Sequence, residues 1–340
     1  MVGVSARQRS EPHYKEPRHR EPRINELRVG VIGLGGMGTF HAQVLNEMNG
    51  ATVAAVADPL NGRLEGLADE LGAAVVDDPM TLATSDAVDA VVVASPDETH
   101  AALALAMIEA ERPVLCEKPL GVTVAEAAEI VEAEERLGRR VLQLGFMREY
   151  DTAHRQVGAA LAELGNVHHI RCVHTNTVTA PRSLQVIVGQ SMVHDIHSVR
   201  FLTGAEFEWV SASHTTDPNG APRHVLVMAR LTNGAHATLE FDDEAYAYHV
   251  SVEITAERGV VTTGHQLRAE IRRDGFRMAE EGADWFARFD QAYRAELADW
   301  VVAARAGGAS GPTAADGLAS QLVVDAIVES VDRGTRVAVG

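Results

Sequence analysis

Three things are scarce in this sequence of 340 residues, and each scarcity excludes a class of protein. Cysteine occurs only at Cys116 and Cys172, too few for a disulfide framework; both lie in apolar runs, so we expect buried free thiols in a reducing compartment. No apolar run approaches the ~20 residues of a membrane span and no signal-peptide core is present, so we expect a cytoplasmic protein without a membrane partner. Positive charge is also scarce, since 30 Lys and Arg face 48 Asp and Glu, and the net charge of -18 argues against a nucleic-acid partner.

What the chain does have is a hydrophobic content of 46%, ordinary for a globular protein, and enough length for two domains with sizeable cores. Residues 1–26 stand apart, because they hold six Lys or Arg, four Glu, three Glu-Pro pairs and almost nothing apolar. This composition predicts a disordered extension. It is either a tail without function or an arm that joins copies of the chain.

Between residues 27 and 146, short apolar runs alternate with helical patterns, which is typical of βαβ units and a parallel, doubly wound sheet. The runs predict strands at 28–32, 52–57, 73–76, 88–94, 113–117 and 140–145. The patterns between them predict helices at 39–48, 61–71, 99–110 and 124–137. The last helix has marked ends, because Thr123 and Glu126 form a capping box and Gly138 suits the position after it.

From residue 147 to 340 the pattern changes to strands joined by hairpins, with helices before and after them. We expect helices at 152–163, 192–203, 284–306 and 313–333, and a long strand at 167–178. Hairpin turns are predicted at Asn233-Gly234, Arg258-Gly259 and Asp274-Gly275. The sequence therefore predicts a second, α+β domain with a mostly antiparallel sheet and helices on one face, whose closing helices are placed to pack back on the first domain.

A G-x-G-x-x-G turn follows the first strand at Gly33, Gly35 and Gly38, and a helical pattern follows the turn. In a dinucleotide-binding fold the first glycine permits the tight turn, the second lets the backbone approach a pyrophosphate, and the third lets helix and strand pack closely. The second strand ends at Asp58, where an acidic side chain binds the ribose hydroxyls of the adenosine. This context favours a bound dinucleotide over a purely structural glycine turn.

Two further loops end strands of the same sheet and therefore lie at the edge where ligands bind. One carries Lys118, whose direction is restricted by Pro119 after it; the alternative is an ordinary surface lysine. The other runs from Ser95 and Pro96 to His100. We expect this loop to line the cofactor groove, although His100 also fits an ordinary position in the first turn of a helix.

In the second half, the helix at 192–203 is expected to begin near Ser191, which puts His194 in its first turn, close to a ligand facing that end. A neutral imidazole there suits a general base near pH 7. The alternative is a histidine that caps the helix or is satisfied in the core. His197 follows three residues later, but two helical histidines without further ligands are poor grounds for a metal site, and we expect no metal.

Together these motifs resemble the glucose-fructose oxidoreductase/inositol dehydrogenase/MocA (Gfo/Idh/MocA) family over residues 27–335, with bacterial inositol 2-dehydrogenases as the nearest members. The most specific motif is Glu117-Lys118-Pro119. The others are the glycine turn followed by His41-Ala42, Ala57-Asp58-Pro59, Ser95-Pro96 through His100, Gly145 to Asp151, Val193-His194-Asp195-Ile196, Phe289 to Leu297, and Gly311 to Gly317.

The resemblance implies an NAD(P)-dependent oxidation of a secondary alcohol on a cyclitol or sugar. It implies that Lys118 hydrogen-bonds the reacting oxygen and that His194 takes the hydroxyl proton while a hydride passes to the nicotinamide. The implied cofactor-binding residues are Gly33, Gly35, Gly36, Met37, Gly38, Asp58, Ser95, Pro96, His100, Glu117 and Lys118. NAD is favoured because the carboxylate of Asp58 repels a 2′-phosphate, whereas the nearby Arg63 keeps NADP as the less favoured alternative.

The implied substrate contacts are Gln190, His197, Asn176 and Tyr246, and two of them depart from the family pattern. Inositol dehydrogenases have an Asp at the position of Gln190, four residues before the histidine, and the family often has an acidic residue at that of His197. A neutral amide can hydrogen-bond a substrate but cannot stabilise an imidazolium by charge. Asn176 and Tyr246 are secondary candidates for contacts with substrate hydroxyls.

These departures leave three interpretations open. The first is a dehydrogenase of a cyclitol or sugar, and the second is the same chemistry on a ring hydroxyl of a glycoside or amino sugar. The third is an NAD-binding sensor or scaffold protein that has lost catalysis. The resemblance also implies a homodimer or homotetramer, with the antiparallel sheet of the second domain as the interface.

Overall fold

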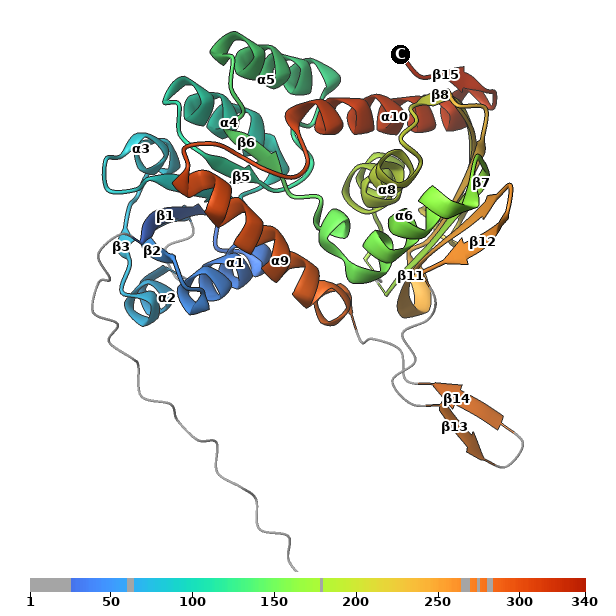
Figure 1. The fold of residues 1–340 in the computed structure, drawn as a ribbon, viewed down its shortest axis with the longest axis horizontal. Helices are drawn as coiled ribbons and strands as arrows, with labels where there is room; N and C mark the ends of the chain where they lie inside the picture. Colours follow the sequence, from blue (N-terminus) through green and yellow to red (C-terminus); the bar gives the residue numbers. More distant parts are fainter. Residues whose placement is uncertain (1–25, 60–63, 178–179, 264–269, 274–275, 280–283) are drawn as a thin grey trace, which may run out of the picture.

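The computed structural model describes residues 26–59, 64–177, 180–263, 270–273, 276–279 and 284–340. Two large sheets organise the chain, one in its N-terminal half and one in its C-terminal half (Figure 1). The extension predicted over residues 1–26 lies outside the described residues apart from Glu26, and so does Arg63. A separate antiparallel pair consists of β13 (Glu270–Arg273) and β14 (Phe276–Ala279).

The first sheet is parallel throughout, with the strand order β3-β2-β1-β4-β5-β6. Its strands are β1 (Leu27–Ile32), β2 (Ala51–Ala57), β3 (Ala74–Val75), β4 (Ala90–Val93), β5 (Val114–Cys116) and β6 (Leu142–Leu144). The central strands are buried on both faces, which explains their continuous apolar runs. The strand order reverses between β1 and β4, so a crevice opens beyond the carboxyl ends of these neighbours. The predicted α/β class with a doubly wound sheet is confirmed.

Five helices connect these strands: α1 (Gly36–Glu47), α2 (Leu64–Leu71), α3 (Pro79–Thr84), α4 (His100–Glu109) and α5 (Val124–Leu137). Helix α5 has the predicted ends, with a capping box between Thr123 and Glu126 and Gly138 at a φ of 74°. Helix α3 is not predicted, because six residues are too few to show a helical period. Its start is nevertheless marked, since the Asp78 carboxylate accepts from the N–H of Thr81 at 2.8 Å.

The second sheet has the order β12-β11-β7-β10-β9-β8-β15 and is antiparallel except where β10 lies beside β7. Its strands are β7 (Val167–Thr177), β8 (Phe207–Thr216), β9 (Pro222–Leu231), β10 (His236–Asp242), β11 (Glu244–Ala256), β12 (Gly259–Thr262) and β15 (Val337–Ala338). The hairpins predicted at Asn233-Gly234 and Arg258-Gly259 are present, and the one at Asp274-Gly275 lies outside the described residues.

The helices of the C-terminal half are α6 (Thr152–Leu164), α7 (Leu184–Val186), α8 (Val193–Thr203), α9 (Trp285–Arg305) and α10 (Ala314–Arg333). Figure 1 shows α6, α8 and α10 on one face of the second sheet. Helix α9 packs back on the first sheet, since Leu297 and Trp300 share a buried cluster with Val29 and Val31 of β1. Helix α10 contacts both α5 and β8, so the two halves share a continuous core.

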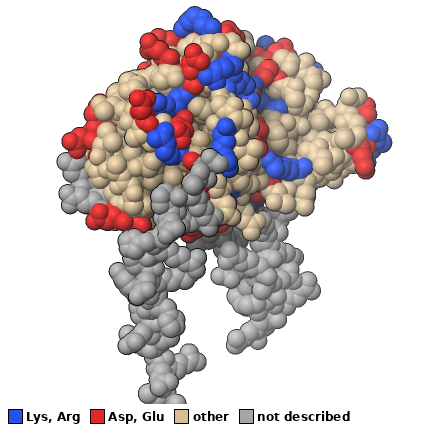
Figure 2. Space-filling model, turned by 60° about the vertical axis from the view of Figure 1, so that its left-hand side comes forward, with Lys and Arg blue, Asp and Glu red and all other residues tan. Residues whose placement is uncertain are grey.

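In the described part of the chain, no helix is long and apolar enough to cross a membrane. Cys116 and Cys172 are buried free thiols, as predicted. On the face shown in Figure 2, Lys and Arg side chains are interspersed with Asp and Glu. This face therefore presents no broad field of a single sign.

Candidate active site

Glycines shape the loop after β1, and two of them leave no room for a side chain. Gly33 has a φ of 85°, and a Cβ on Gly38 would lie 1.7 Å from the carbonyl oxygen of Gly33. Helix α1 therefore packs directly against the turn. Gly35 faces open space and caps α1 without a side-chain hydrogen bond, so the first N–H groups of the helix are available to an anion. This cradle fits the pyrophosphate of a dinucleotide.

Asp58, at the end of β2, hydrogen-bonds to the same turn. Its side chain is buried, and Oδ2 accepts from the N–H of Leu34 at 2.6 Å. The carboxylate thus stands beside the glycine turn, at the place where the sequence predicts the ribose contact.

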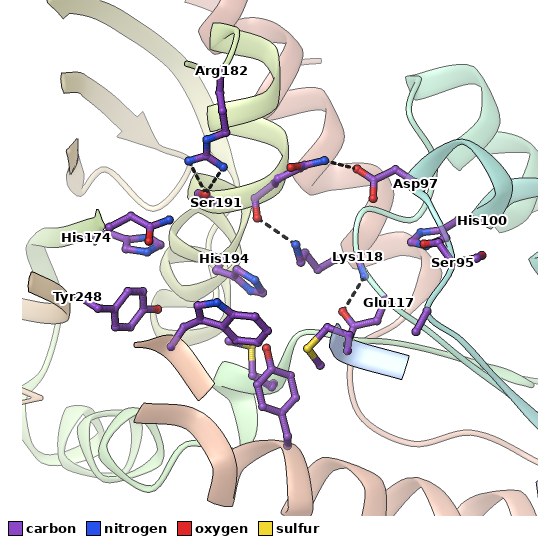
Figure 3. A pocket seen from close by; sticks show the side chains of 17 residues that line it. Ser95, Asp97, His100, Glu117, Lys118, His174, Arg182, Ser191, His194 and Tyr248 are labelled. Atoms are coloured by element: carbon purple, nitrogen blue, oxygen red, sulfur yellow. Dashed lines mark hydrogen bonds between the residues drawn. The ribbon is translucent and has the colours of Figure 1, made fainter. Parts of the chain in front are cut away.

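A cavity of about 370 Å³ lies between the two halves of the chain, a size within the range of small-molecule sites (Figure 3). The predicted site residues that line it are Met37, Ser95, His100, Glu117, Lys118, Asn176, Gln190 and His194. The predicted cofactor residues outside its lining are Gly33, Gly35, Gly36, Gly38, Asp58 and Pro96. Because Met37 lies in the first turn of α1, the cavity adjoins the glycine turn.

His100 holds together the two loops that end β4 and β5. Its Nδ1 lies 2.7 Å from the carbonyl oxygen of Pro119 and its Nε2 2.9 Å from that of Ser95. A neutral imidazole donates from one nitrogen only, so the protonated ring suits this position. Burial lowers the pKa of His100, but Cys116 and the two carbonyl groups outweigh it and raise the pKa to about 10. His100 thus shapes the groove with both ring nitrogens already occupied.

Lys118 extends into the cavity from the end of β5 (Figure 3). Its Nζ donates to the main-chain oxygen of Gln190 at 3.0 Å, which ties the N-terminal half to the C-terminal half. Burial lowers the pKa of Lys118, and the carboxylates of Glu117 and Asp97 oppose that shift. Glu117 is itself held by His41, whose Nε2 lies 2.8 Å from Oε1.

His194 faces the same cavity from the first turn of α8, as predicted, but α8 continues an earlier helical segment. Helical structure already begins at Leu184, where the Ser183 hydroxyl accepts from the N–H of Val186, and continues through a π-helical stretch, Ile187–Met192, into α8. The wider turn of a π-helix breaks the 3.6-residue period, so the apolar pattern marks the start of the helix too late. Such bulges are common at functional sites.

The imidazole of His194 is buried, and its Nδ1 has no hydrogen-bond partner among the described residues. Burial, together with the positive charges of Lys118 and Arg148, holds the pKa of His194 well below its usual range. The ring is therefore neutral near pH 7 and able to accept a proton. The unpartnered Nδ1 is itself buried, so the cavity meets another part of the ring.

Asp195, the residue after His194, belongs to a buried ion pair. Arg148 donates to Asp195 Oδ1 at 2.5 Å, and Asp195 Oδ2 lies 2.8 Å from His174 Nδ1. Burial raises the pKa of Asp195, but Arg148 and His174 outweigh it and hold the pKa at about 2. The carboxylate next to His194 in sequence is therefore committed to other partners.

The four predicted substrate contacts have different fates. Gln190 and Asn176 line the cavity, and the side chain of Tyr246 lies outside the described residues. His197 does not line the cavity: its ring stacks on Phe146 at a centroid distance of 4.0 Å, and its Nε2 lies 2.8 Å from Glu149 Oε1. Its packing explains its burial, and we withdraw it as a substrate contact.

Sequence reasoning does not single out several other residues of the cavity wall, namely Asp97, His174, Arg182, Ser191, Tyr248, Trp285 and Tyr293. Tyr248 lies two residues after Tyr246 on β11, so strand alternation was an available signal. Arg182 offers no such signal, because it comes from a loop and is held by Asp243, 61 residues away. In the part of the chain that the structure describes, no group of three or more His, Cys, Asp or Glu side chains is arranged to hold a metal ion.

Comparison with known proteins agrees with this geometry. Residues 27–146 match the family described as "Oxidoreductase family, NAD-binding Rossmann fold", and residues 154–262 match the GFO/IDH/MocA C-terminal domain. The chain is 40% identical over 313 residues to an inositol 2-dehydrogenase of Rubrobacter xylanophilus, covering 89% of this chain and 90% of that protein. It is 37% identical over 322 residues to inositol 2-dehydrogenase 1 of Saccharopolyspora erythraea, covering 90% and 94%.

The fold is similar to that of the myo-inositol dehydrogenase of Lactobacillus casei solved with NAD(H) and myo-inositol. The TM-score is 0.88 at 26% sequence identity, covering 93% of this chain and 97% of that one. Sequence and fold thus agree over both halves of the molecule. The chain belongs to the Gfo/Idh/MocA family of oxidoreductases, and its N-terminal sheet and helices form that family's NAD-binding Rossmann fold.

Proposed function

We propose that the protein oxidises a secondary alcohol of a cyclitol or sugar with NAD, in the cytoplasm. The observation that carries the proposal is that Lys118 and His194, from opposite halves of the chain, face one cavity next to the glycine turn. The relatives named inositol 2-dehydrogenases, which cover most of the chain, support a cyclitol as substrate.

The residues of the Rossmann half fit the cofactor. The N–H groups at the start of α1 would hold the pyrophosphate, and Asp58 would hold the adenosine ribose. NAD held in this crevice would supply the hydride acceptor for the carbinol carbon. A carboxylate at Asp58 favours NAD over NADP, because it repels a 2′-phosphate.

Two side chains act on the alcohol. Lys118, a hydrogen-bond donor fixed by the main-chain oxygen of Gln190, would bind the reacting oxygen and stabilise the charge that develops there. His194, neutral because burial and nearby cations lower its pKa, would take the hydroxyl proton as general base.

The test is NADH formation from NAD with a panel of cyclitols, sugars, glycosides and amino sugars. We expect turnover of at least one cyclitol or sugar, and a fall of about 10²- to 10⁴-fold in kcat for His194→Asn with NADH affinity retained. Turnover of glycosides or amino sugars alone would assign the second substrate class. Tight NAD binding without turnover of any compound would reject the dehydrogenase and favour a sensor.

We also propose a division into two domains near residue 146, which the separate family matches to residues 27–146 and 154–262 support.

We further propose a homodimer or homotetramer joined through the second sheet. Its support is the apolar exposure of β9, where Leu226 is 40% and Met228 54% exposed. Light scattering at two protein concentrations would measure the assembly.

A further inference from the structure

A hydrogen bond between two side chains crosses the cavity wall from one half of the molecule to the other (Figure 3). The Nε2 of Gln190 donates to Asp97 Oδ2 at 2.8 Å, although the residues are 93 positions apart. Asp97 begins the short turn after β4, and Gln190 lies in the π-helical stretch before α8. Since the main-chain oxygen of Gln190 accepts from Lys118 Nζ, these three residues form one connected unit, here named the 97–190 clasp.

The chemistry of Asp97 fixes the orientation of the Gln190 amide. An ionised carboxylate has acceptors only, so the amide must turn its NH₂ group toward Asp97. Its carbonyl oxygen, Oε1, then lies on the other arm of the amide. This orientation leaves Oε1 outside the contact with Asp97, and the main-chain bond to Lys118 puts position 190 next to the proposed catalytic ammonium.

The charge of Asp97 also acts on Lys118. Burial lowers the pKa of Lys118, and Asp97 is one of the carboxylates that oppose this shift. A carboxylate at position 190 instead of the amide would face Asp97 across the 2.8 Å contact, where two like charges repel. The residue types at positions 97 and 190 are thus coupled.

Building on the proposed function, we propose that Asp97 is a positioning residue that fixes Gln190 Oε1 as the acceptor for a substrate hydroxyl adjacent to the one held by Lys118. The substrate class that this arrangement selects is a ring with a vicinal diol. A substrate analogue with hydrogen or a methoxy group in place of the adjacent hydroxyl has no hydrogen-bond donor there, so Gln190 Oε1 would remain without a partner. Polar sites discriminate strongly against analogues of that kind.

The experiment compares the wild-type enzyme with Asp97→Asn, Gln190→Glu and the double variant that carries both. We expect Gln190→Glu to lower kcat/KM about 10- to 100-fold and to make the activity rise toward acidic pH, because protonation of one carboxyl relieves the repulsion. The double variant restores the bond in reverse, since the amide introduced at position 97 can donate to the carboxylate introduced at position 190, and it should recover most of the lost kcat/KM. Loss of preference for the vicinal diol over its deoxy analogue should accompany Asp97→Asn.

Two controls make the result specific. Glu98→Gln removes a neighbouring exposed carboxylate and should leave kcat/KM unchanged. The affinity for NADH, measured by fluorescence titration, should stay within about twofold in every variant, because neither Asp97 nor Gln190 is among the implied cofactor-binding residues. A double variant no better than Gln190→Glu, or a parallel loss of NADH affinity, overturns the inference. Absence of turnover in the wild type would reject the proposed function itself, whereas turnover without rescue rejects only the clasp.

Discussion

Glu296 is a buried carboxyl group whose ionisation should weaken the fold. It lies on α9 with no exposed surface, and neither of its oxygens has a hydrogen-bond partner among the described residues. Burial, followed by the negative charges of Glu117 and Glu149, raises its pKa well above the usual value of 4.5. In the folded protein the group therefore stays protonated at pH values where the unfolded chain has released the proton.

The consequence for stability has a definite sign. Between the unfolded-state and the folded-state pKa, the folded protein binds more protons than the unfolded chain. The contribution of Glu296 to the free energy of unfolding is therefore complete below about pH 4.5 and is lost as the pH rises. Between the unfolded-state and folded-state pKa values the slope is about -1.4 kcal/mol per pH unit. Glu296→Gln removes this titration. The melting temperature of the variant relative to wild type should therefore rise with pH, by about 2 °C for each kcal/mol.

The assay is calorimetric unfolding of both proteins at several values between about pH 5 and pH 8. Glu129→Gln serves as a matched control, because Glu129 is exposed on α5 and its removal should change stability by less than about 0.5 kcal/mol at any pH. Glu296→Met also removes the unpaired polar atoms, so it should raise the free energy of unfolding by about 1–3 kcal/mol at all pH values. A difference in melting temperature between Glu296→Gln and the wild type that does not change with pH would refute the reasoning.

Three further predictions concern the base, the glycine turn and the assembly. The ring signals of His194, followed by nuclear magnetic resonance, should show no protonation from neutral pH down to about pH 6 because its pKa is lowered; a midpoint at or above its usual 6.5 would contradict this. Gly38→Ala should weaken NADH binding at least about tenfold, since its Cβ has no room, whereas Gly66→Ala, in open space on α2, should not; equal affinities would show that the turn adapts. Met228→Lys should shift the assembly toward smaller species in light scattering, while Val302→Lys on α9, 70% exposed, should not; an unchanged assembly would place the interface elsewhere.

Sequence patterns predict the parts of the fold that depend on local chemistry. Buried parallel strands appear as apolar runs, and Thr123, Glu126 and Gly138 mark the ends of α5 through hydrogen bonds that span only a few residues. Lys118 could be placed at the edge of the sheet because strand ends in a parallel sheet meet there. Its role, and that of His194, came from the family resemblance, because spacing alone left an ordinary surface lysine and a core histidine open.

The parts that sequence reasoning missed depend on contacts between distant residues. His197 was expected near the substrate from the family resemblance, but Phe146 and Glu149 from the preceding part of the chain occupy its ring face and its Nε2. The partnership of Gln190 with Asp97 spans 93 residues. Neither contact leaves a periodic pattern in the sequence.

These contacts also decide how the site would handle a proton. Asp195 follows His194 in sequence, yet its carboxylate is committed to Arg148 and His174, and Gln190 is uncharged. If His194 takes the substrate proton as proposed, no carboxylate among the described residues is bonded to the ring to stabilise the imidazolium, and Lys118 and Arg148 disfavour it. A base with a lowered pKa accepts a proton only briefly and releases it readily.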